Sequence, residues 1–376
     1  MRRRLARLSG PHLVPAGGPR FLLIMRLPLG DTLFVTPTVH ALRQRYPGAQ
    51  ITALAAGVNA PLLAHNPDLD DTITLPLLGD WRGGGALPAT LRRLRRRRYD
   101  LALNFSTPGL GWLANACGIA DQEYLDYLPF WWLLPHDFSG WNQRHAVELY
   151  ATVARHLDIP PLERRTHVHV TTAERAETAR LLQKLRLSGA PLRIAMHPGS
   201  GAAPAQKRWP IDLFAEVGRT LAAQTEAEIV IIGGPSEVQL AAQLSRSIGL
   251  RAESVAGQFT LRQTMALLAA CDLFVGNDSG PLHVAAAVGT PVVGVYGSTD
   301  PVVFGPWAPL GQVVTLQPPG VRPEIHFVGG ATLWDQVCGT RRSNTTLATL
   351  PAASVITASL QFLEQRDTIA AAAGAR

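Results

Sequence analysis

The chain alternates short apolar runs with helical patterns, and it does so in two successive series. The first series places apolar runs at residues 20–26, 50–56, 71–77 and 101–106, with helical patterns at 31–47 and 87–100. The second places them at 192–200, 227–234, 272–278 and 290–297, with helical patterns at 210–224, 236–249, 260–271 and 281–289. Strands that alternate with helices form parallel sheets. The sequence therefore predicts two doubly wound, Rossmann-like α/β domains, with a cleft between the carboxyl ends of their strands.

Four segments follow from this pattern. At 376 residues the chain is long enough for two domains with separate cores. The predicted segments are a basic extension at 1–19, an N-terminal domain at 20–170, a C-terminal domain at 171–350, and a helix with a frayed tail at 351–376.

Composition narrows the class of protein. Hydrophobic residues make up 47% and charged residues 17%, as in a globular protein, and no uncharged apolar run reaches the roughly 18 residues of a membrane span. The basic start lacks the apolar core of a signal peptide, and the 3 cysteines lack disulfide or zinc spacing. We therefore expect a cytoplasmic protein. The net charge of +7 favours anionic partners: nucleotide phosphates, a phosphorylated glycolipid or the inner membrane face.

Asp31 follows the first predicted strand, where open α/β sheets place their ligands. A carboxylate at this point can accept a proton from a substrate hydroxyl. It can equally cap the helix that begins here, and the position alone does not choose between the two roles.

A second candidate segment is MHPGSGAAPAQKRWP, residues 196–210. A strand ends at His197, a loop of small residues follows, and Lys207 stands before the next helix. Small residues let backbone N–H groups reach an anion, and the lysine adds a compact positive charge. The spacing is not that of a P-loop, and a flexible surface loop is the alternative.

The third candidate is GNDSGPLHVAAAVG, residues 276–289, between two apolar strands. Ser279 can cap the helix, Gly280 admits a ligand close to the backbone, and Pro281 suits the first turn. Such a helix start suits a phosphate, because its N–H groups lack partners and its dipole end is positive. Asp278 and His283 flank it, and a histidine here can contact the anion or pack inward. A well-capped connection is the alternative.

Three further motifs are weaker. The arginine run at 92–98 predicts a solvated helix face or a contact with anionic lipid or acceptor phosphates. The Gly109-x-Gly111-x-x-Ala114 pattern matches a dinucleotide fingerprint only superficially, because it follows the fourth strand. Asp68-x-Asp70 is interpreted as a surface loop, and no set of residues has convincing metal spacing.

With these motifs in order, the sequence resembles glycosyltransferase family 9, the ADP-heptose:lipopolysaccharide heptosyltransferases. The matching stretches are LGDTLFVTPTVHALRQRYPGAQITAL, MHPGSGAAPAQKRWPIDLFAEV, IIGGPSE and FVGNDSGPLHVAAAVGTPVVGVYGSTDP, across most of residues 20–305. The resemblance implies the GT-B architecture and an inverting transfer of heptose from ADP-heptose to a lipopolysaccharide-core or related glycan. It implies no cofactor and no metal, with the ADP-sugar as donor substrate.

The resemblance also implies roles for particular residues. Asp31 matches the catalytic base and Lys207 the phosphate-binding lysine. The donor segment comprises Asp278, Ser279, Gly280 and His283, with Ser200 as a further donor-side residue. The expected partners are a nucleotide sugar, a glycolipid acceptor and the inner face of the cytoplasmic membrane, and nucleic acid is not among them. The segments at 127–150 and 311–342 depart from the family pattern.

Two other functions remain open from the sequence. One is a non-catalytic protein that binds a nucleotide sugar or glycolipid. The other is a GT-B-like epimerase, or an NAD-dependent enzyme that uses the Gly109 loop.

Overall fold

A computed structural model describes residues 18–75, 86–106, 110–124, 144–184, 190–201, 207–297, 299–319 and 347–374. The chain divides into two compact units, Met1–Glu163 and Arg164–Arg376. We call them the N-terminal and C-terminal units.

The N-terminal unit is built on a parallel sheet of five strands in the order β3-β2-β1-β4-β5. Its strands are β1 (Arg20–Met25), β2 (Gln50–Ala56), β3 (Asp71–Leu75), β4 (Leu101–Asn104) and β5 (Gln122–Tyr124). Strand β1 lies in the centre, and five of its six residues are buried. Such continuous apolar strands belong to sheets that are covered on both faces.

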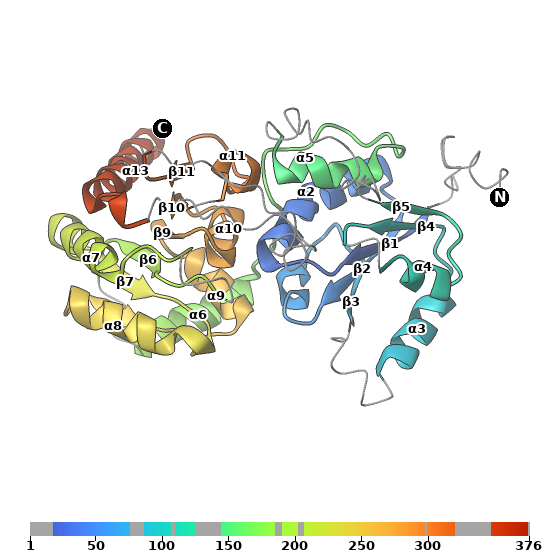
Figure 1. Ribbon diagram of the computed structural model, residues 1–376, viewed down its shortest axis with the longest axis horizontal. Helices are drawn as coiled ribbons and strands as arrows, with labels where there is room; N and C mark the ends of the chain where they lie inside the picture. The colour runs from blue at the N-terminus through green and yellow to red at the C-terminus, as the bar shows by residue number, and fades with distance from the viewer. Residues whose placement is uncertain are drawn as a thin grey trace. The chain divides into compact units, whose positions relative to one another are not determined.

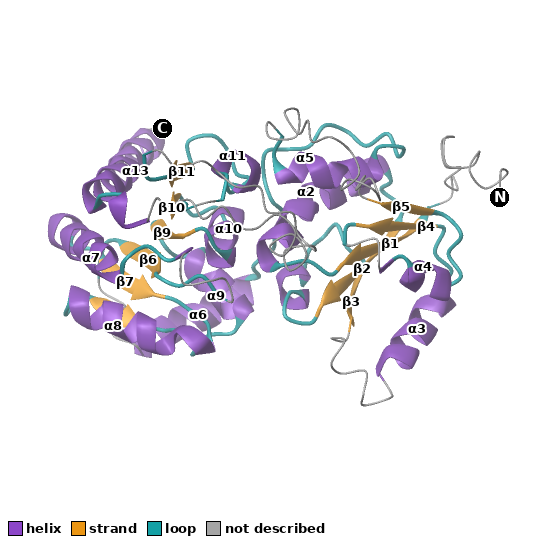
Figure 2. Ribbon diagram, viewed as in Figure 1, coloured by secondary structure: helices purple, strands orange, loops and turns teal. Residues whose placement is uncertain are grey.

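Helices cover both faces of this sheet. They are α2 (Leu29–Arg45), η1 (Ala60–Leu63), α3 (Ala86–Arg96), α4 (Trp112–Ala116), α5 (Ala146–Ala151) and η5 (Thr152–Ala154). Helices α2 and α5 contact each other, as do α3 and α4 (Figures 1 and 2). Because α2 lies between the sheet and α5, almost all of its residues up to Leu42 are buried.

The C-terminal unit has a parallel sheet of six strands in the order β11-β10-β9-β6-β7-β8. The strands are β6 (Arg193–His197), β7 (Glu228–Ile231), β8 (Ala252–Ser254), β9 (Leu273–Asn277), β10 (Val292–Val295) and β11 (Val313–Leu316). Counted from β6, this is the 3-2-1-4-5-6 order of a Rossmann domain. The order reverses between β6 and β9, and ligands bind at such a switch point.

The helices of the C-terminal unit also form two layers. They are α6 (Thr172–Lys184), α7 (Ile211–Thr225), η7 (Pro235–Glu237), α8 (Val238–Ile248), α9 (Leu261–Leu268), α10 (Gly280–Ala287), α11 (Pro301–Phe304), η8 (Leu347–Thr349) and α13 (Ala352–Gly374). Helix α7 contacts α8 and α13, whereas α9 contacts α6 and α10 (Figure 1). Helix α13 contributes Val355, Ala358 and Phe362 to this unit's core, and it continues to Gly374, beyond the point where the sequence predicts fraying.

The two predicted parallel-sheet α/β domains are confirmed, but short edge elements escaped prediction. Strands β5 and β8 have three residues each and β11 has four, so none shows a clear period. Strand β11 begins at Val313, inside the segment at 311–342 that the sequence left without a pattern.

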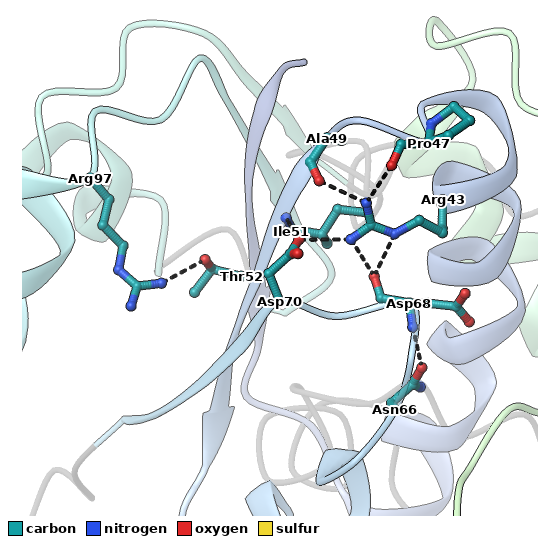
Figure 3. Close-up of polar contacts among 9 residues, drawn as sticks. All are labelled: Arg43, Pro47, Ala49, Ile51, Thr52, Asn66, Asp68, Asp70 and Arg97. Carbon is teal, nitrogen blue, oxygen red and sulfur yellow. Dashed lines mark hydrogen bonds and ion pairs between the residues drawn. The ribbon is translucent and has the colours of Figure 1, made fainter.

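The Asp68-x-Asp70 segment is a loop, as predicted, with Asp70 at the surface and Asp68 buried. The Arg43 guanidinium donates to the carbonyls of Pro47 and Ala49, to the Asp68 carbonyl and to Asp70 Oδ2 (Figure 3). The buried Asp68 carboxylate lies 2.9 Å from His40 Nδ1. One arginine on α2 thus joins the turn that precedes β2 to the turn that precedes β3.

The arginine run is divided between two roles. Arg93 and Arg97 pair with Asp71 on β3, and Arg97 also donates to Thr52 (Figure 3). Arg95 donates to the carbonyl of Ala116. Leu94 of the same helix is buried in the core of the unit, while Arg92 and Arg96 are exposed. Part of the run therefore holds α3 in place, and part forms a basic surface.

Candidate functional site

Asp31 lies in the first turn of α2, after the carboxyl end of β1. It is only 9% exposed, and its Oδ1 accepts a 2.8 Å hydrogen bond from the Tyr150 hydroxyl. The N-cap position belongs to Pro28, which has no side-chain cap bond. Asp31 is therefore not the N-cap residue of α2, and its Oδ1 bonds to a tyrosine of α5.

Buried polar side chains fix the segment between β1 and α2. Asn59 Nδ2 donates to the carbonyl of Leu27 at 2.6 Å and to Thr32 Oγ1 at 3.2 Å. Ser106, which follows β4, accepts the backbone N–H of Arg26 at 2.6 Å. The segment that leads into the first turn of α2 is thus held by residues that follow β2 and β4, the neighbours of β1 in the sheet.

Lys207 lies in the C-terminal unit, at the carboxyl edge of the second sheet. Its Nζ lies 3.4 Å from Asp278 Oδ2, after β9, and 3.0 Å from Thr299 Oγ1, after β10. The lysine side chain is 30% exposed and that of Asp278 12%. The structure therefore brings Lys207 and Asp278 together, as the motifs suggested, and adds Thr299.

Asn277 braces this edge of the sheet. This fully buried amide accepts the N–H of Trp209 at 3.0 Å and donates to the carbonyls of Pro198 and Gly199 at 2.9 and 3.1 Å. It joins the end of β9 to both ends of the loop that carries Lys207. Sequence reasoning missed it, although an asparagine that ends an apolar strand is a usable signal, since buried amides need partners.

His283 packs inward, toward Asp278. Its Nε2 lies 3.9 Å from Asp278 Oδ1, and the residue is 7% exposed. Burial lowers the pKa of His283 to about 4, with Asp278 opposing the shift and Lys207 adding to it. The imidazole is therefore neutral at pH 7, and Lys207 supplies the positive charge in this group.

Ser279 occupies the N-cap position of α10, but its side chain makes no cap bond. Its hydroxyl lies 3.0 Å from His197 Nδ1 and 3.0 Å from the carbonyl of Asn277. Ser279 therefore stands at the predicted N-cap position, but the expected cap bond from its side chain is absent. His197, at the end of β6, competes for the hydroxyl.

His197 is joined in turn to Glu237, and sequence reasoning gave neither a role. His197 Nε2 lies 3.2 Å from Glu237 Oε2, and both side chains are buried. Glu237 also accepts the N–H groups of Gly201 and Gly234, each at 2.9 Å. A Cβ on Gly199 would lie 1.9 Å from Glu237 Oε1, so any other residue there would displace the Glu237 carboxylate. Both residues stand at or just after the carboxyl end of a strand, His197 at the end of β6 and Glu237 in the PSE turn after β7. Those positions in the sequence could have indicated them.

These contacts control the charge on Glu237. Burial alone would raise its pKa, but the hydrogen bond and charge of His197 and the two glycine N–H groups outweigh burial. The pKa of Glu237 is lowered to about 2. A carboxylate accepts hydrogen bonds and donates none, so His197 Nε2 carries the proton between them.

The remaining predicted residues lie near this group. Ser200 is buried and accepts a 3.1 Å hydrogen bond from Arg208 Nε. Gly280 is the first residue of α10. Residues 202–206 of the Lys207 loop, and Gly109 of the dinucleotide-like pattern, lie outside the described residues. Among the described residues, Lys207, Asp278, Ser279, Gly280 and His283 share the carboxyl edge of the second sheet, and Asp31 belongs to the other unit.

Comparison with known proteins bears on what this arrangement does. The model of glycosyltransferase family 9 (heptosyltransferase) matches residues 89–326, more than half of the chain. The chain belongs to glycosyltransferase family 9.

Its relatives cover most of its length. Lipopolysaccharide heptosyltransferase 2 of Escherichia coli K12 is 28% identical over 322 residues, which covers 77% of this chain and 85% of the relative. Lipooligosaccharide heptosyltransferase 2 of Haemophilus ducreyi is 28% identical over 307 residues, with 77% and 86% covered.

Solved structures share the fold. A family 9 glycosyltransferase of Veillonella parvula aligns with a TM-score of 0.75 at 20% identity, covering 94% of this chain and 99% of that one. E. coli ADP-heptose lps heptosyltransferase II aligns with a TM-score of 0.70 at 23% identity, covering 93% and 99%. The two parallel-sheet domains are thus those of the GT-B fold. The protein is a glycosyltransferase, and neither the binding protein nor the epimerase is favoured.

The Glu237 environment predicts a pH-dependent stability. A carboxylate whose folded pKa is about 2, against an ordinary 4.5, stabilises the fold above pH 4.5, and that stabilisation is lost between pH 4.5 and 2. We expect Glu237→Gln to lower the unfolding free energy by on the order of 2 kcal/mol at pH 7 and by much less near pH 2. Urea unfolding across this range measures it.

The control for this experiment is Glu253→Gln, which alters an exposed carboxylate of the same unit. It should leave stability nearly unchanged at every pH. An equal loss in Glu237→Gln at pH 7 and at pH 2.5 would contradict the charge-based account.

Proposed function

We propose that this enzyme transfers heptose, with inversion, from ADP-heptose to a lipopolysaccharide-core or related cell-envelope glycan. The observation that carries the proposal is the Lys207, Asp278 and Thr299 cluster beside the start of α10, in a chain of this family. The relatives are named lipopolysaccharide and lipooligosaccharide heptosyltransferases, which supports the donor and the acceptor class.

The C-terminal unit is the proposed donor side. When a sugar leaves a nucleotide diphosphate, negative charge grows on the departing phosphate, so cations and N–H donors aimed there lower the barrier. Lys207 supplies the cation. The N–H of Gly280, the first residue of α10, is the proposed donor, because Pro281 has no N–H and that of Leu282 already donates to the Ser279 carbonyl. We propose that these groups stabilise the leaving ADP without a metal ion.

The N-terminal unit is the proposed acceptor side, with Asp31 as base. The acceptor oxygen attacks the anomeric carbon, the bond from that carbon to the diphosphate oxygen breaks, and its electron pair leaves with ADP. The acceptor hydroxyl proton passes to the Asp31 carboxylate. Such a base typically contributes on the order of 10²- to 10⁴-fold in rate.

The place of action is proposed as the cytoplasmic face of the inner membrane. The described residues include no helix with the length and apolarity needed to cross a bilayer. Arg92 and Arg96 are exposed on one side of α3, and Trp112 of the contacting helix α4 is 38% exposed. Arginine attracts anionic lipid headgroups and tryptophan favours the interface, so this basic surface suits a peripheral contact.

Donor binding is tested at Lys207. We expect ADP-heptose to raise the melting temperature of the wild type more than UDP-, GDP- or dTDP-sugars do, because a ligand that binds the native state stabilises it. Lys207→Ala should lose most of that shift and weaken ADP binding about 10-fold or more in calorimetry. The matched control is Lys184→Ala, the chain's other lysine, which is exposed at the end of α6. Unchanged ADP affinity in Lys207→Ala would remove the phosphate role.

The base is tested at Asp31. Asp31→Asn keeps the shape of the side chain but cannot take the proton, so heptose transfer should fall by about 10²-fold or more. ADP affinity should stay within about twofold of wild type. Release of ADP from ADP-heptose in the presence of lipopolysaccharide core measures the rate. Full activity in this variant would refute the assignment.

Membrane contact is tested on α3. The double variant Arg92→Glu with Arg96→Glu should bind vesicles of phosphatidylcholine and phosphatidylglycerol at least about 10-fold more weakly, since each basic residue near the surface contributes about 1 kcal/mol. Arg175→Glu with Arg180→Glu makes the same charge change on the exposed face of α6 and should bind as wild type. Equal loss in both pairs would indicate net charge alone.

A further inference from the structure

Tyr150 makes a buried contact with Asp31, and the proposed reaction assigns this tyrosine no role. Its hydroxyl donates to Asp31 Oδ1 at 2.8 Å, across 119 residues of sequence. Tyr150 is 5% exposed and Asp31 9%. Since a hydrogen bond to an ionised group is among the stronger ones, this contact restricts how the carboxylate can turn.

The helix that carries Tyr150 is itself held in place. Helix α5 has six residues and starts in a capping box, in which His145 Nδ1 accepts the N–H of Val147 and Glu148 accepts that of His145. The His145 ring meets Phe34 of α2 edge-on, with 5.1 Å between centroids. Phe105 lies 6.5 Å from the Tyr150 ring. The phenol is therefore presented to α2 by a helix packed on α2.

We infer that Tyr150 is a positioning residue that fixes the orientation of the Asp31 carboxylate for proton transfer. This inference rests on the proposed role of Asp31 as base. A carboxylate has about four acceptor positions, and the phenol takes one of them in a defined direction. The bond also favours the ionised carboxylate, the form that accepts a proton. A tyrosine placed only for packing would need no hydroxyl at this point.

Tyr150→Phe removes the hydroxyl and keeps the ring. We expect kcat for heptose transfer to fall on the order of 10- to 100-fold, as for a misoriented reacting group, with the KM for ADP-heptose within about twofold. The acid limb of the kcat/KM profile should move to higher pH, because the ionised carboxylate loses a donor. If Tyr150 had a purely structural role, its loss would not lower kcat selectively and would not shift the pH profile.

The matched control is Tyr46→Phe. Tyr46 lies at the other end of α2, and its hydroxyl donates at 3.1 Å to the carbonyl of Leu157. Its variant should lower the melting temperature by a similar amount while leaving kcat and the pH profile at wild-type values. If Tyr150→Phe and Tyr46→Phe differ only in stability, the inference is overturned.

A second variant covers the case in which Tyr150→Phe fails to fold. Replacement of Tyr150 by 3-fluorotyrosine keeps the ring and the hydroxyl but makes the phenol a stronger donor. The acid limb should then move to lower pH, opposite to the effect of phenylalanine, and an unmoved limb would overturn the inference.

The proposed function and the role of Tyr150 can be refuted separately. A wild-type enzyme that releases no ADP from ADP-heptose with any core acceptor removes the proposed function. An active wild type with an inactive Asp31→Asn and a Tyr150→Phe of wild-type kcat and pH profile removes only the role of Tyr150.

Discussion

The parallel pairing of strands within each unit decides where the candidate site residues lie. Because all strands of a sheet run the same way, every loop that leaves a carboxyl end emerges at one edge. Lys207 follows β6, Asp278 follows β9 and Thr299 follows β10, and pairing of β9 with both neighbours brings them within hydrogen-bonding distance. Asp31 holds the equivalent place after the central strand of the other sheet.

Buried polar side chains then hold the loops at that edge in fixed positions. An unpaired buried amide or carboxylate is costly, so each of these side chains must satisfy all of its partners at once. Asn277 does so with one N–H and two carbonyls, and Glu237 with His197 and two glycine N–H groups. The loops of the C-terminal unit are thus held by residues that need not touch a ligand.

The alternation of strands and helices was predictable, because apolar period and punctuating residues report local structure. The grouping of Lys207, Asp278 and His283 followed from strand ends alone. Contacts between residues far apart in the sequence could not be predicted in this way. Ser279 has the residue type and place of a cap, yet His197, 82 residues away, takes its hydroxyl. Tyr150 escaped notice because helix α5 is only six residues long, too short for a clear helical period.

The charge balance at Lys207 has a consequence for specificity. An isolated lysine would attract any anion, but Asp278 neutralises this one, and the neutral His283 adds no charge. Among the described residues, Asp278 and Thr299 take two of the three ammonium protons. In the proposed donor role, a ligand would need enough negative charge to compete with Asp278 and an acceptor for the start of α10 as well. A diphosphate would meet both conditions better than a single carboxylate, so we propose that Asp278 makes the lysine selective for the more highly charged anion.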